Sequence, residues 1–566
     1  MRWIFTQGVA GDKIRTLAER LDVPESIATL LIRRGLTSVE WATKFLNPRL
    51  ADLGDPFEIQ NMDRAVDRIL TALDGQKRIV LYGDYDVDGV TAVTILTRIL
   101  REYGAIVFGF VPVREEEGYG LSEAGLRRCF QAGKPDMLIA VDCGTANAPQ
   151  IERLRRQGIE VIVLDHHEAK AEVPVCEAFI NPKVHGGLYY LCSAGLAFKL
   201  GHALLKRRRL ETVDLKQYLD LVALGTLSDL VALEAENRIF VRRGLIQMGE
   251  TRWVGLRALM DVSGVQAPLV AADVGFKLGP RVNAAGRMGS AESALRLLLT
   301  DDQSIARTLA QELDEQNRER RMVEEGVFAK AETQWLQESE MRPRVSIVVG
   351  SKSWHPGVVG IVASRLMRKY HRPTFVIGFG ADGECRGSGR SIPGLPLVNT
   401  LEACQAHLLQ FGGHEMAAGI CLSIDAFRDF SEAFEAEARR HLTLALLEPT
   451  LSIDAEITLD EVHSQFLEFF EMLAPFGMGN PTPVFVCRGV QPEAPPRWMK
   501  DKHLQLTLRQ GGHRFRAIWF HAPTEPLPPA PWDMAFEVSR NEYRGVVSPQ
   551  ILVRALRRVP ADPEGV

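Results

Sequence analysis

Short apolar runs alternate with helical stretches from about residue 60 to residue 235, and this alternation limits the possible folds more than any other feature. The first run, RIVLYG (78–83), is followed by a proline-free helical stretch from Val90 to Tyr103. The later runs are AIVFGFV (105–111), MLIAV (137–141) and IEVIVL (159–164). Strands that alternate with helices predict a mainly parallel sheet covered on both faces. We therefore expect an α/β fold in this region.

The 566 residues are enough for several hydrophobic cores. Residues 1–60 suggest short helices, an N-terminal appendage to the α/β domain at 61–300. Residues 301–340 are charged and free of proline, with a sparse apolar stripe, which predicts a long, largely solvated helix that bridges two lobes. A second α/β domain at 341–445 and a strand-rich segment at 446–566, expected to form a small antiparallel barrel, complete the chain.

Composition excludes several classes of protein. Hydrophobic residues make up 46% and charged residues 25% of the chain, which is typical of a soluble globular protein. The formal net charge of −5 gives no overall attraction to nucleic acid, although a local basic groove could still bind it. The eight cysteines form no Cys-x-x-Cys pair, which argues against a zinc ribbon and favours reduced thiols in the cytoplasm. We expect neither a signal peptide nor a membrane span.

Acidic side chains follow the predicted strands at the point where each strand ends. They are Asp84, Asp86 and Asp88 after the first run, Asp142 after the third, and Asp165, with His166 and His167, after the fourth. The carboxyl ends of parallel strands meet at one edge of the sheet, where ligands bind in open α/β folds. Clustered carboxylates repel one another unless a cation lies among them. The sequence therefore predicts a metal site at this edge.

Two simpler explanations compete with a catalytic metal site. The DxDxDG pattern from Asp84 to Gly89 also opens a calcium-binding loop. That loop needs a preceding helix and a glutamate at its twelfth position, but a strand precedes Asp84 and the twelfth residue is Ile95. Asp229, in GTLSD, is a further candidate ligand, yet by itself it could equally be a helix cap.

Aspartate and histidine ligands suit Mn²⁺ or Mg²⁺, and they suit Zn²⁺ less well because no thiolate is present. Two such ions held by shared carboxylates form the usual arrangement for in-line displacement at phosphorus. The sequence offers no convincing Ser/His/Asp arrangement for covalent catalysis.

The order DxDxDG, VDxG, DHH and GTxxD resembles the DHH phosphoesterase superfamily, and within it the single-strand-specific exonucleases. The resemblance extends over about residues 60–560. Longer motifs support it: REEEGYGL (114–121), INPK (180–183), GPRVNAAGRM (279–288), SWHPGVVGIVASRL (353–366), RGSGRSIPG (386–394), FGGHEMAAG (411–419) and APFGMGNPTPVF (474–485).

The resemblance implies roles for the residues at the strand ends. It implies that the metal ligands are Asp84, Asp86, Asp88, Asp142, His166 and Asp229, with Asp142 between the two ions. It assigns His167 to the scissile phosphate and Asp165 to orienting its neighbours. The cofactors implied are two divalent ions, Mn²⁺ or Mg²⁺.

The resemblance also implies a DHH-associated domain at 341–445 and an OB-fold-like barrel at 446–566. Residues implied to bind the substrate, above all a terminal 5′ phosphate, are Arg114, Arg281, Ser388, Arg390, His355 and His414. For Arg281 a structural salt bridge is the competing interpretation. Basic and aromatic residues of the barrel suit single-stranded nucleic acid; the candidates are Lys500, Lys502, Arg514, Arg516 and Trp519, together with Trp498 and His503. Each tryptophan is equally well explained as barrel core.

The function implied is a single-stranded-DNA-specific 5′-to-3′ exonuclease that releases 5′-mononucleotides and acts in recombination and repair. It implies a bacterial cytoplasmic monomer whose partners are single-stranded DNA, single-strand-binding protein and a RecQ-type helicase. A closed ring of lobes is expected. Two alternatives stay open: a nano-RNase, cyclic-dinucleotide phosphodiesterase or inorganic-phosphate hydrolase of the same superfamily, and a scaffold of the same fold with a decayed metal site. The intact acidic and histidine positions argue against the scaffold, and the barrel argues against a small substrate.

Overall fold

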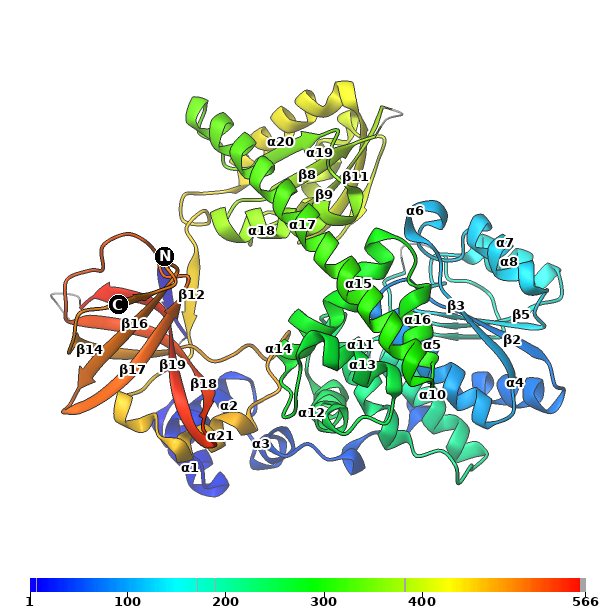
Figure 1. Cartoon of the computed structure of the whole chain (residues 1–566), viewed down its shortest axis with the longest axis horizontal. Coiled ribbons are helices and arrows are strands. Elements are labelled where there is room, and N and C mark those ends of the chain that lie inside the picture. The colour runs from blue at the N-terminus through cyan, green and yellow to red at the C-terminus, as the bar shows by residue number, and fades with distance from the viewer. Residues whose placement is uncertain (7, 170–171, 189, 381–382, 560–566) are drawn as a thin grey trace.

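Three lobes lie around a common centre in this computed structural model (Figure 1). The described residues are 1–6, 8–169, 172–188, 190–380 and 383–559. The end of the predicted C-terminal domain, 560–566, lies outside them. Among the helices of these ranges, none combines the length and the apolar character that crossing a bilayer requires.

The first lobe contains the predicted parallel sheet. Its strands are β2 (Arg78–Tyr82), β3 (Ile106–Phe110), β4 (Met137–Val141), β5 (Glu160–Leu164) and β6 (Ala178–Ile180). They pair in parallel in the order β3-β2-β4-β5-β6. The order along the chain reverses between β2 and β4, so the switch point of the sheet lies between these two strands. The four predicted apolar runs are thus confirmed as neighbouring strands.

Helices cover both faces of this sheet. The helices of this lobe are α4 (Met62–Asp74), α5 (Val87–Glu102), α6 (Arg114–Glu117), α7 (Glu123–Cys129), α8 (Ala148–Arg156), α9 (Pro182–His185), α10 (Ser193–Arg207), α11 (Leu219–Ser228), α12 (Ala235–Gly249), α13 (Val254–Ser263), α14 (Ala271–Asp273), α15 (Gly279–Met288) and α16 (Glu292–Leu299). Helix α5 is the central one, because it is buried along most of its length and contacts α10, α11 and α16 as well as the sheet. Its apolar sides explain why this segment packs inside the lobe.

The long helix α17 (Gln303–Met341) connects the first lobe to the second, as predicted. Its first half packs Leu309 and Leu313 into the core of the first lobe. Its second half packs Phe328 and Trp335 into the core of the second lobe. The helix is therefore less solvated than the sequence suggested, because alanine and aromatic residues widen the sparse leucine stripe.

The second lobe is a mixed α/β domain. Its strands and helices are β7 (Ile347–Ser351), β8 (Thr374–Phe379), β9 (Glu384–Arg390), β10 (Gln410–Gly413), β11 (Ala417–Ser423), α18 (Pro356–Tyr370), α19 (Leu397–Ala403) and α20 (Phe427–His441). The strand order is β10-β11-β9-β8-β7, in which β7 and β8 are parallel and the other pairs are antiparallel. Helix α18 lies against α17 and faces α15 of the first lobe.

The third lobe is mainly β, as predicted. Its elements are β13 (Ala455–Glu456), α21 (Ser464–Met472), β14 (Phe485–Pro492), β15 (Arg497–Met499), β16 (His503–Gln510), β17 (His513–Phe520), β18 (Trp532–Tyr543) and β19 (Val546–Arg558). They form one sheet in the order β13-β14-β18-β19-β17-β16-β15. Because β14 also pairs with β16, the sheet curls on itself around its apolar core.

The N-terminal residues belong with this third lobe. Strand β1 (Arg2–Phe5) pairs in parallel with β12 (Thr450–Ile453). The helices α1 (Gly11–Leu21), α2 (Glu25–Arg33) and α3 (Val39–Leu46) bring buried apolar side chains into the same core as Phe466 and Phe536. The sequence predicted these helices but not their packing partner, because an amphipathic stripe does not specify the surface that covers it.

A buried arginine joins the first and third lobes. Arg238, on α12, is only 2% exposed and donates hydrogen bonds to the carbonyl oxygens of Phe45, Met472 and Ala474 over 2.8–3.0 Å. Its guanidinium also lies over the ring of Phe45, 3.6 Å from the centroid. Burial lowers the pKa of Arg238 to about 9. Since its partners are carbonyl groups from two separate segments, this side chain fixes how the lobes meet.

We expect Arg238→Ala to weaken the contact between the first and third lobes by about 1–3 kcal/mol, because the carbonyl group of Phe45 would lose its donor and those of Met472 and Ala474 would keep only Arg242. Hydrogen exchange of the 472–480 amides, together with the thermal midpoint, would report the change. Arg209→Ala is the matched control, since Arg209 is an exposed arginine of the same lobe that pairs with Glu211. Equal exchange in the two variants would contradict the role of Arg238.

Candidate metal centre

The acidic residues meet at the switch point of the parallel sheet. Asp84 follows β2, and Asp142 follows the neighbouring strand β4 with a positive φ of 64°. Aspartate tolerates this left-handed backbone better than most residues because its short side chain bonds locally. Asp165 and His166 follow β5, the next strand along. The edge predicted from the sequence therefore brings these side chains together.

Two helix N-termini orient the DxDxDG motif. Asp86 caps α5 and accepts a hydrogen bond from the amide of Gly89. Asp88 lies in the first turn of α5, is 1% exposed, and accepts hydrogen bonds of 2.7 and 2.8 Å from the amides of Ser193 and Ala194 at the start of α10. Helix N-termini stabilise negative charge. The chain thus supplies fixed dipoles that hold the carboxylates in place.

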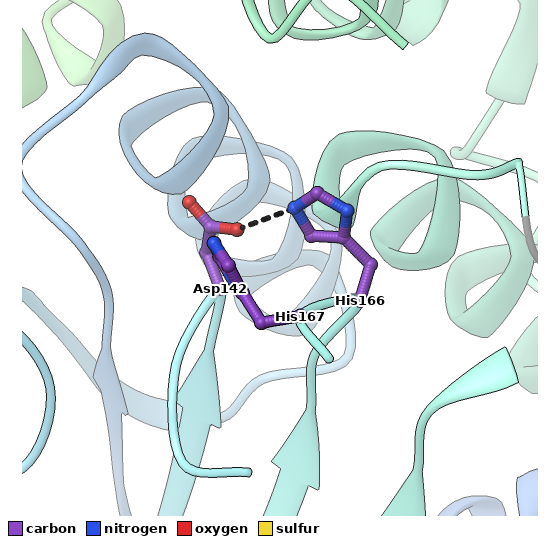
Figure 2. A group of neighbouring side chains, drawn as sticks. All are labelled: Asp142, His166 and His167. Atoms are coloured by element: carbon purple, nitrogen blue, oxygen red, sulfur yellow. Dashed lines mark ion pairs between the residues drawn. The ribbon is translucent and has the colours of Figure 1, made fainter. Parts of the chain in front are cut away.

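His166 lies at the centre of the cluster. Its Nε2 atom is 3.3 Å from Asp142 Oδ1, 3.6 Å from Asp229 Oδ2 and 3.7 Å from Asp88 Oδ2. Figure 2 shows the imidazole of His166 directed at the carboxylate of Asp142, with His167 beside it. Asp229, for which a capping role was the alternative, ends α11 and points into this cluster.

The ligand atoms fall into overlapping groups in which every pair of atoms lies within 4.8 Å. One group is Asp84, Asp86 and Asp142; another is Asp88, His166 and Asp229; a third is Asp142, His166 and His167. Asp142 therefore belongs to the first group and also touches His166 of the second. This is the arrangement required of a carboxylate shared between two cations.

The side chains present fit divalent cations. Among the described residues, both ring nitrogens of the buried His166 and the Oδ1 atom of Asp84 have no hydrogen-bond partner. Buried polar atoms are normally satisfied, so these atoms call for an external partner. Carboxylate oxygens with one imidazole are ligands that Mn²⁺ and Mg²⁺ accept.

Electrostatics leads to the same interpretation. Burial and the neighbouring carboxylates raise the pKa values of Asp84 and Asp142 well above the ordinary aspartate value. Burial and the charges of Asp88 and Asp86 raise the pKa of Asp229 to about 9. Burial lowers the pKa of His166 to about 4, so its ring is neutral near pH 7 and can donate a lone pair to a metal.

Asp165 contacts both histidines through hydrogen bonds. Its Oδ1 atom accepts hydrogen bonds from the amides of His166 and His167 and lies 2.8 Å from Nδ1 of His167. Its Oδ2 atom accepts from the amide of Thr145. Burial alone would raise the pKa of Asp165, but the bonds from His167 and Thr145 hold it below its ordinary value. Burial disfavours the charged form of His167, but the hydrogen bond and the charge of Asp165 favour it. The pKa of His167 is therefore raised above its ordinary value.

The predicted phosphate residues of the second lobe lie together. Arg390 and Ser388 are on β9, and the Arg390 guanidinium donates to the Ser388 hydroxyl over 2.9 Å. Gly360 of α18 lies so close that a Cβ there would be 3.0 Å from Ser388 Oγ. His355 caps the start of α18 and accepts from the amide of Gly357, while His414 is exposed after β10.

The two arginines of the GPRVNAAGRM motif have different surroundings. Arg281 is held in an ion pair of 2.8 Å with the buried Asp314 of α17, which is the salt-bridge interpretation considered above. Arg287 ends α15, donates to the carbonyl of Gly357 in the second lobe, and lies near Asp86. Burial and the positive charge of Arg114 lower the pKa of Arg287 to about 10.

Arg287 is therefore the arginine of this motif that the fold brings to the acidic cluster, and the sequence analysis missed it. Helical periodicity could have indicated it, because positions 281 and 287 lie on different sides of one helix. Arg114 begins α6, exposed, with its guanidinium 5.3 Å from the ring centroid of Tyr85.

The predicted nucleic-acid residues of the third lobe lie in two places. Arg514 and Arg516, with Gln505, Asn541 and Gln550, line a concave site of about 460 Å³ on β16 to β19. Lys500 and Lys502 are exposed at the β15–β16 turn. Trp519 faces the other side of β17 and packs against the core, whereas Trp498 is 44% exposed.

The fold and the site together define a class: a metal-dependent phosphoesterase with a DHH-type catalytic domain and a DHH-associated second domain. Family models match in the same places. They are the DHH family, N-terminal domain (residues 78–226), the DHHA1 domain (344–440) and the RecJ OB domain (453–555).

Similar proteins cover nearly the whole chain. The single-stranded-DNA-specific exonuclease RecJ of Dickeya dadantii is 35% identical over 94% of this chain and 97% of its own length. The RecJ of Escherichia coli is 33% identical over 95% of this chain and 97% of its own length. A crystal structure of RecJ from Thermus thermophilus in complex with Mn²⁺ has a TM-score of 0.85 and 31% identity, covering 100% of this chain and 81% of that one. The chain belongs to the RecJ family.

Thermus thermophilus RecJ has also been solved with Mg²⁺. Both ions are those predicted from the aspartate and histidine donors of the present chain. The cofactor of this chain is therefore a divalent metal of this kind, Mn²⁺ or Mg²⁺.

We expect the thermal midpoint of the metal-free protein to decrease as the pH is raised from 7 to 9. Folded Asp229 keeps a proton up to about pH 9, whereas the unfolded chain has released it. Stability linked to that proton is therefore lost as the pH rises, and the lowered pKa of His166 acts only below this window. Calorimetry after chelation, repeated with excess Mg²⁺, would measure it.

Added Mg²⁺ should flatten this pH dependence, because the cation replaces the proton. Asp229→Asn should flatten it without metal. An equal slope with and without Mg²⁺ would contradict the assignment of Asp229 to the metal centre.

Proposed function

We propose that this protein is a metal-dependent exodeoxyribonuclease specific for single-stranded DNA, which removes 5′-mononucleotides from the 5′ end in DNA recombination and repair. The observation that carries the proposal is the carboxylate of Asp142, shared between two groups of metal ligands in a member of the RecJ family. A shared carboxylate suits two-metal hydrolysis of phosphodiesters better than a structural cation.

The residues have distinct duties in this reaction. Asp84, Asp86 and Asp142 would hold one cation, and Asp88, His166 and Asp229 the other. Two divalent cations held there supply Lewis-acid stabilisation of the charge that develops on the phosphate oxygens. The amides at the N-termini of α5 and α10 keep the carboxylates in place, so the protein does not reorganise during the reaction.

His167 is the residue of the chain suited to the scissile phosphate. Its Nδ1 atom is occupied by Asp165, which leaves Nε2 to donate a proton in a hydrogen bond to a phosphate oxygen. The side chain is 44% exposed, unlike that of His166 at 6%. A raised pKa favours the charged imidazolium that such a contact needs.

Recognition of a 5′ phosphate would explain attack from one end. The donors for such a phosphate would be Arg287, which lies near Arg114 and Asp86 on the first lobe, together with Ser388 and Arg390 on the second lobe. Arginine matches phosphate oxygens with a planar pair of donors. His355 and His414 would contact the backbone phosphates that follow. A terminal phosphate bound here sets the distance to the first scissile bond.

The third lobe would bind the rest of the strand. Arg514 and Arg516 can contact phosphates from the concave site, and the exposed Trp498 can stack on a base. Lys500 and Lys502 extend the positive surface at the adjoining turn. An OB-like domain has no use in hydrolysing a dinucleotide, so this lobe favours a polymer.

We extend the proposal to a monomer in the bacterial cytoplasm that cooperates with single-strand-binding protein and a RecQ-type helicase. The eight cysteines form no Cys-x-x-Cys pair, which supports a reducing compartment. A helicase would supply the single strand that the enzyme consumes.

A timed digest in Mn²⁺ tests the activity, its strand specificity and its polarity. One oligonucleotide labelled at either end, beside its duplex, should release the 5′ label at once as a mononucleotide, while the 3′-labelled strand shortens stepwise. The duplex should survive. Asp142→Asn, which keeps the left-handed backbone favourable, is the control and should be at least about a hundredfold slower. Cleavage confined to dinucleotides would replace the polymer with a small substrate.

We expect Arg287→Ala to lose most of the preference for 5′-phosphorylated over 5′-hydroxyl ends, because its guanidinium lies between the lobes beside the metal centre. Arg281→Ala is the matched control from the same helix and should keep the preference, although it loses its ion pair with Asp314. The ratio of kcat/KM for the two kinds of end measures the effect. If only Arg281→Ala lost the preference for 5′-phosphorylated ends, Arg281 and not Arg287 would be the residue that recognises the phosphate.

A further inference from the structure

The segment 113–121 passes over the metal centre and carries a tyrosine that has no role so far. It contains the motif REEEGYGL, which begins with Arg114. We propose that Tyr119 is a positioning residue that holds the ring of His167 in the orientation needed at the scissile phosphate. This inference rests on the proposed function and goes beyond it by naming a second support of His167.

The hydroxyl of Tyr119 contacts two parts of the metal centre. It donates a hydrogen bond of 3.2 Å to the backbone carbonyl of Asp142 and lies 3.0 Å from Nδ1 of His167. The rings of Tyr119 and His167 also meet edge to face, with centroids 5.5 Å apart. Tyr119 therefore ties the residue that follows β4 to the histidine that follows β5.

The proton positions fix the roles in this contact. Nδ1 of His167 lies 2.8 Å from Asp165 Oδ1, which already accepts from the amides of His166 and His167, so this nitrogen carries the hydrogen. The Tyr119 oxygen is a second acceptor that shares this one hydrogen with Asp165, and its own hydrogen goes to the carbonyl of Asp142. Nε2 of His167 is left to face the substrate.

The segment is built to present this side chain. Gly118 and Gly120 flank Tyr119 with φ values of 75° and 78°, a backbone that other residues rarely adopt. A Cβ on Gly120 would lie 2.6 Å from the side-chain oxygen of Asn147, so a larger residue there would have to displace this side chain. The hydroxyl of Tyr82 donates to the carbonyl of Gly120.

The other end of the segment is anchored as well. Glu117 pairs with Arg128 through two contacts of 2.6 and 2.9 Å and accepts a hydrogen bond from the amide of Val113. Arg128 in turn lies over the ring of Phe110. With both ends anchored, the segment holds Tyr119 firmly enough to restrain a second side chain.

A single restraint would leave the His167 ring free to swing. Asp165 contacts one atom, Nδ1, about which the imidazole can still tilt. The Tyr119 hydroxyl meets the same Nδ1 atom from another direction, and two partners together set the direction of the N–H bond and with it the tilt of the ring. Outer residues that orient a catalytic group typically contribute about 10- to 100-fold to activity. Tyr119 should therefore affect the chemical step more than metal or DNA binding.

The test compares Tyr119→Phe with the wild type in Mn²⁺ on a 5′-phosphorylated single strand. We expect kcat to fall by about 10-fold or more, with KM and Mn²⁺ affinity by calorimetry within about threefold of wild type. Tyr103→Phe is the matched control, because its hydroxyl also donates to a backbone carbonyl, that of Arg208, away from the metal centre. Its kcat should match the wild type.

A crystal structure of metal-free Tyr119→Phe supplies a reading that does not depend on activity. The His167 ring should leave the position it has beside Asp165 or lose its defined orientation. An unchanged kcat in Tyr119→Phe would overturn the positioning role while leaving the exonuclease intact. If the wild type itself cuts no single strand, the proposed function fails, and a His167 ring unmoved in the variant would then overturn the positioning role separately.

Discussion

Mutual repulsion among buried carboxylates is the constraint on which the rest of this structure depends. Asp84, Asp88 and Asp142 lie within a few ångströms of one another with almost no access to solvent. Water cannot screen charges in such a place, so their ionised forms are stable only beside a cation. The raised pKa values of the cluster express the same fact for the metal-free chain. Metal binding and local stability are thus one property.

The fold holds this cluster through rigid elements rather than loops. The carboxyl ends of β2, β4 and β5 place the side chains, and the amides that begin α5 and α10 fix their angles. The lobes are then joined by elements that leave little freedom. Helix α17 contributes to the cores of two lobes, and Arg238 binds carbonyl groups of two chain segments at the third. A strand that contacts all three lobes would meet one fixed path.

Much of this was predictable, because periodicity and strand ends are local properties of the sequence. Asp84, Asp142 and His166 come together since parallel strands share an edge. Asp229 needed the structure or a family resemblance, because its place depends on how α11 packs behind the sheet. The packing of α1 to α3 on the third lobe could not be predicted, since it joins segments more than 400 residues apart.

Some candidate residues were chosen wrongly or missed, and each case has a physical reason. Arg281 and Arg287 share a motif, but only a three-dimensional partner such as Asp314 shows which one is occupied. Trp519 could have been placed inside the sheet from strand alternation, because Arg514 and Arg516 occupy the opposite face of β17. Nothing in the sequence singled out Tyr119 except its glycine neighbours. One partner of its hydroxyl is a backbone carbonyl, a group that every residue has.

Arginine side chains are concentrated opposite the acidic cluster, and each of these two groups of like charges is stabilised by ions of the opposite sign. Arg287 and Arg390 are deeply placed arginines whose pKa values burial lowers, and Arg287 also faces Arg114. Like charges so placed are relieved by an anion, as the carboxylates are relieved by cations. Under the proposed function, a phosphate group between the lobes would answer both needs, because its oxygens could face arginines on one side and metals on the other.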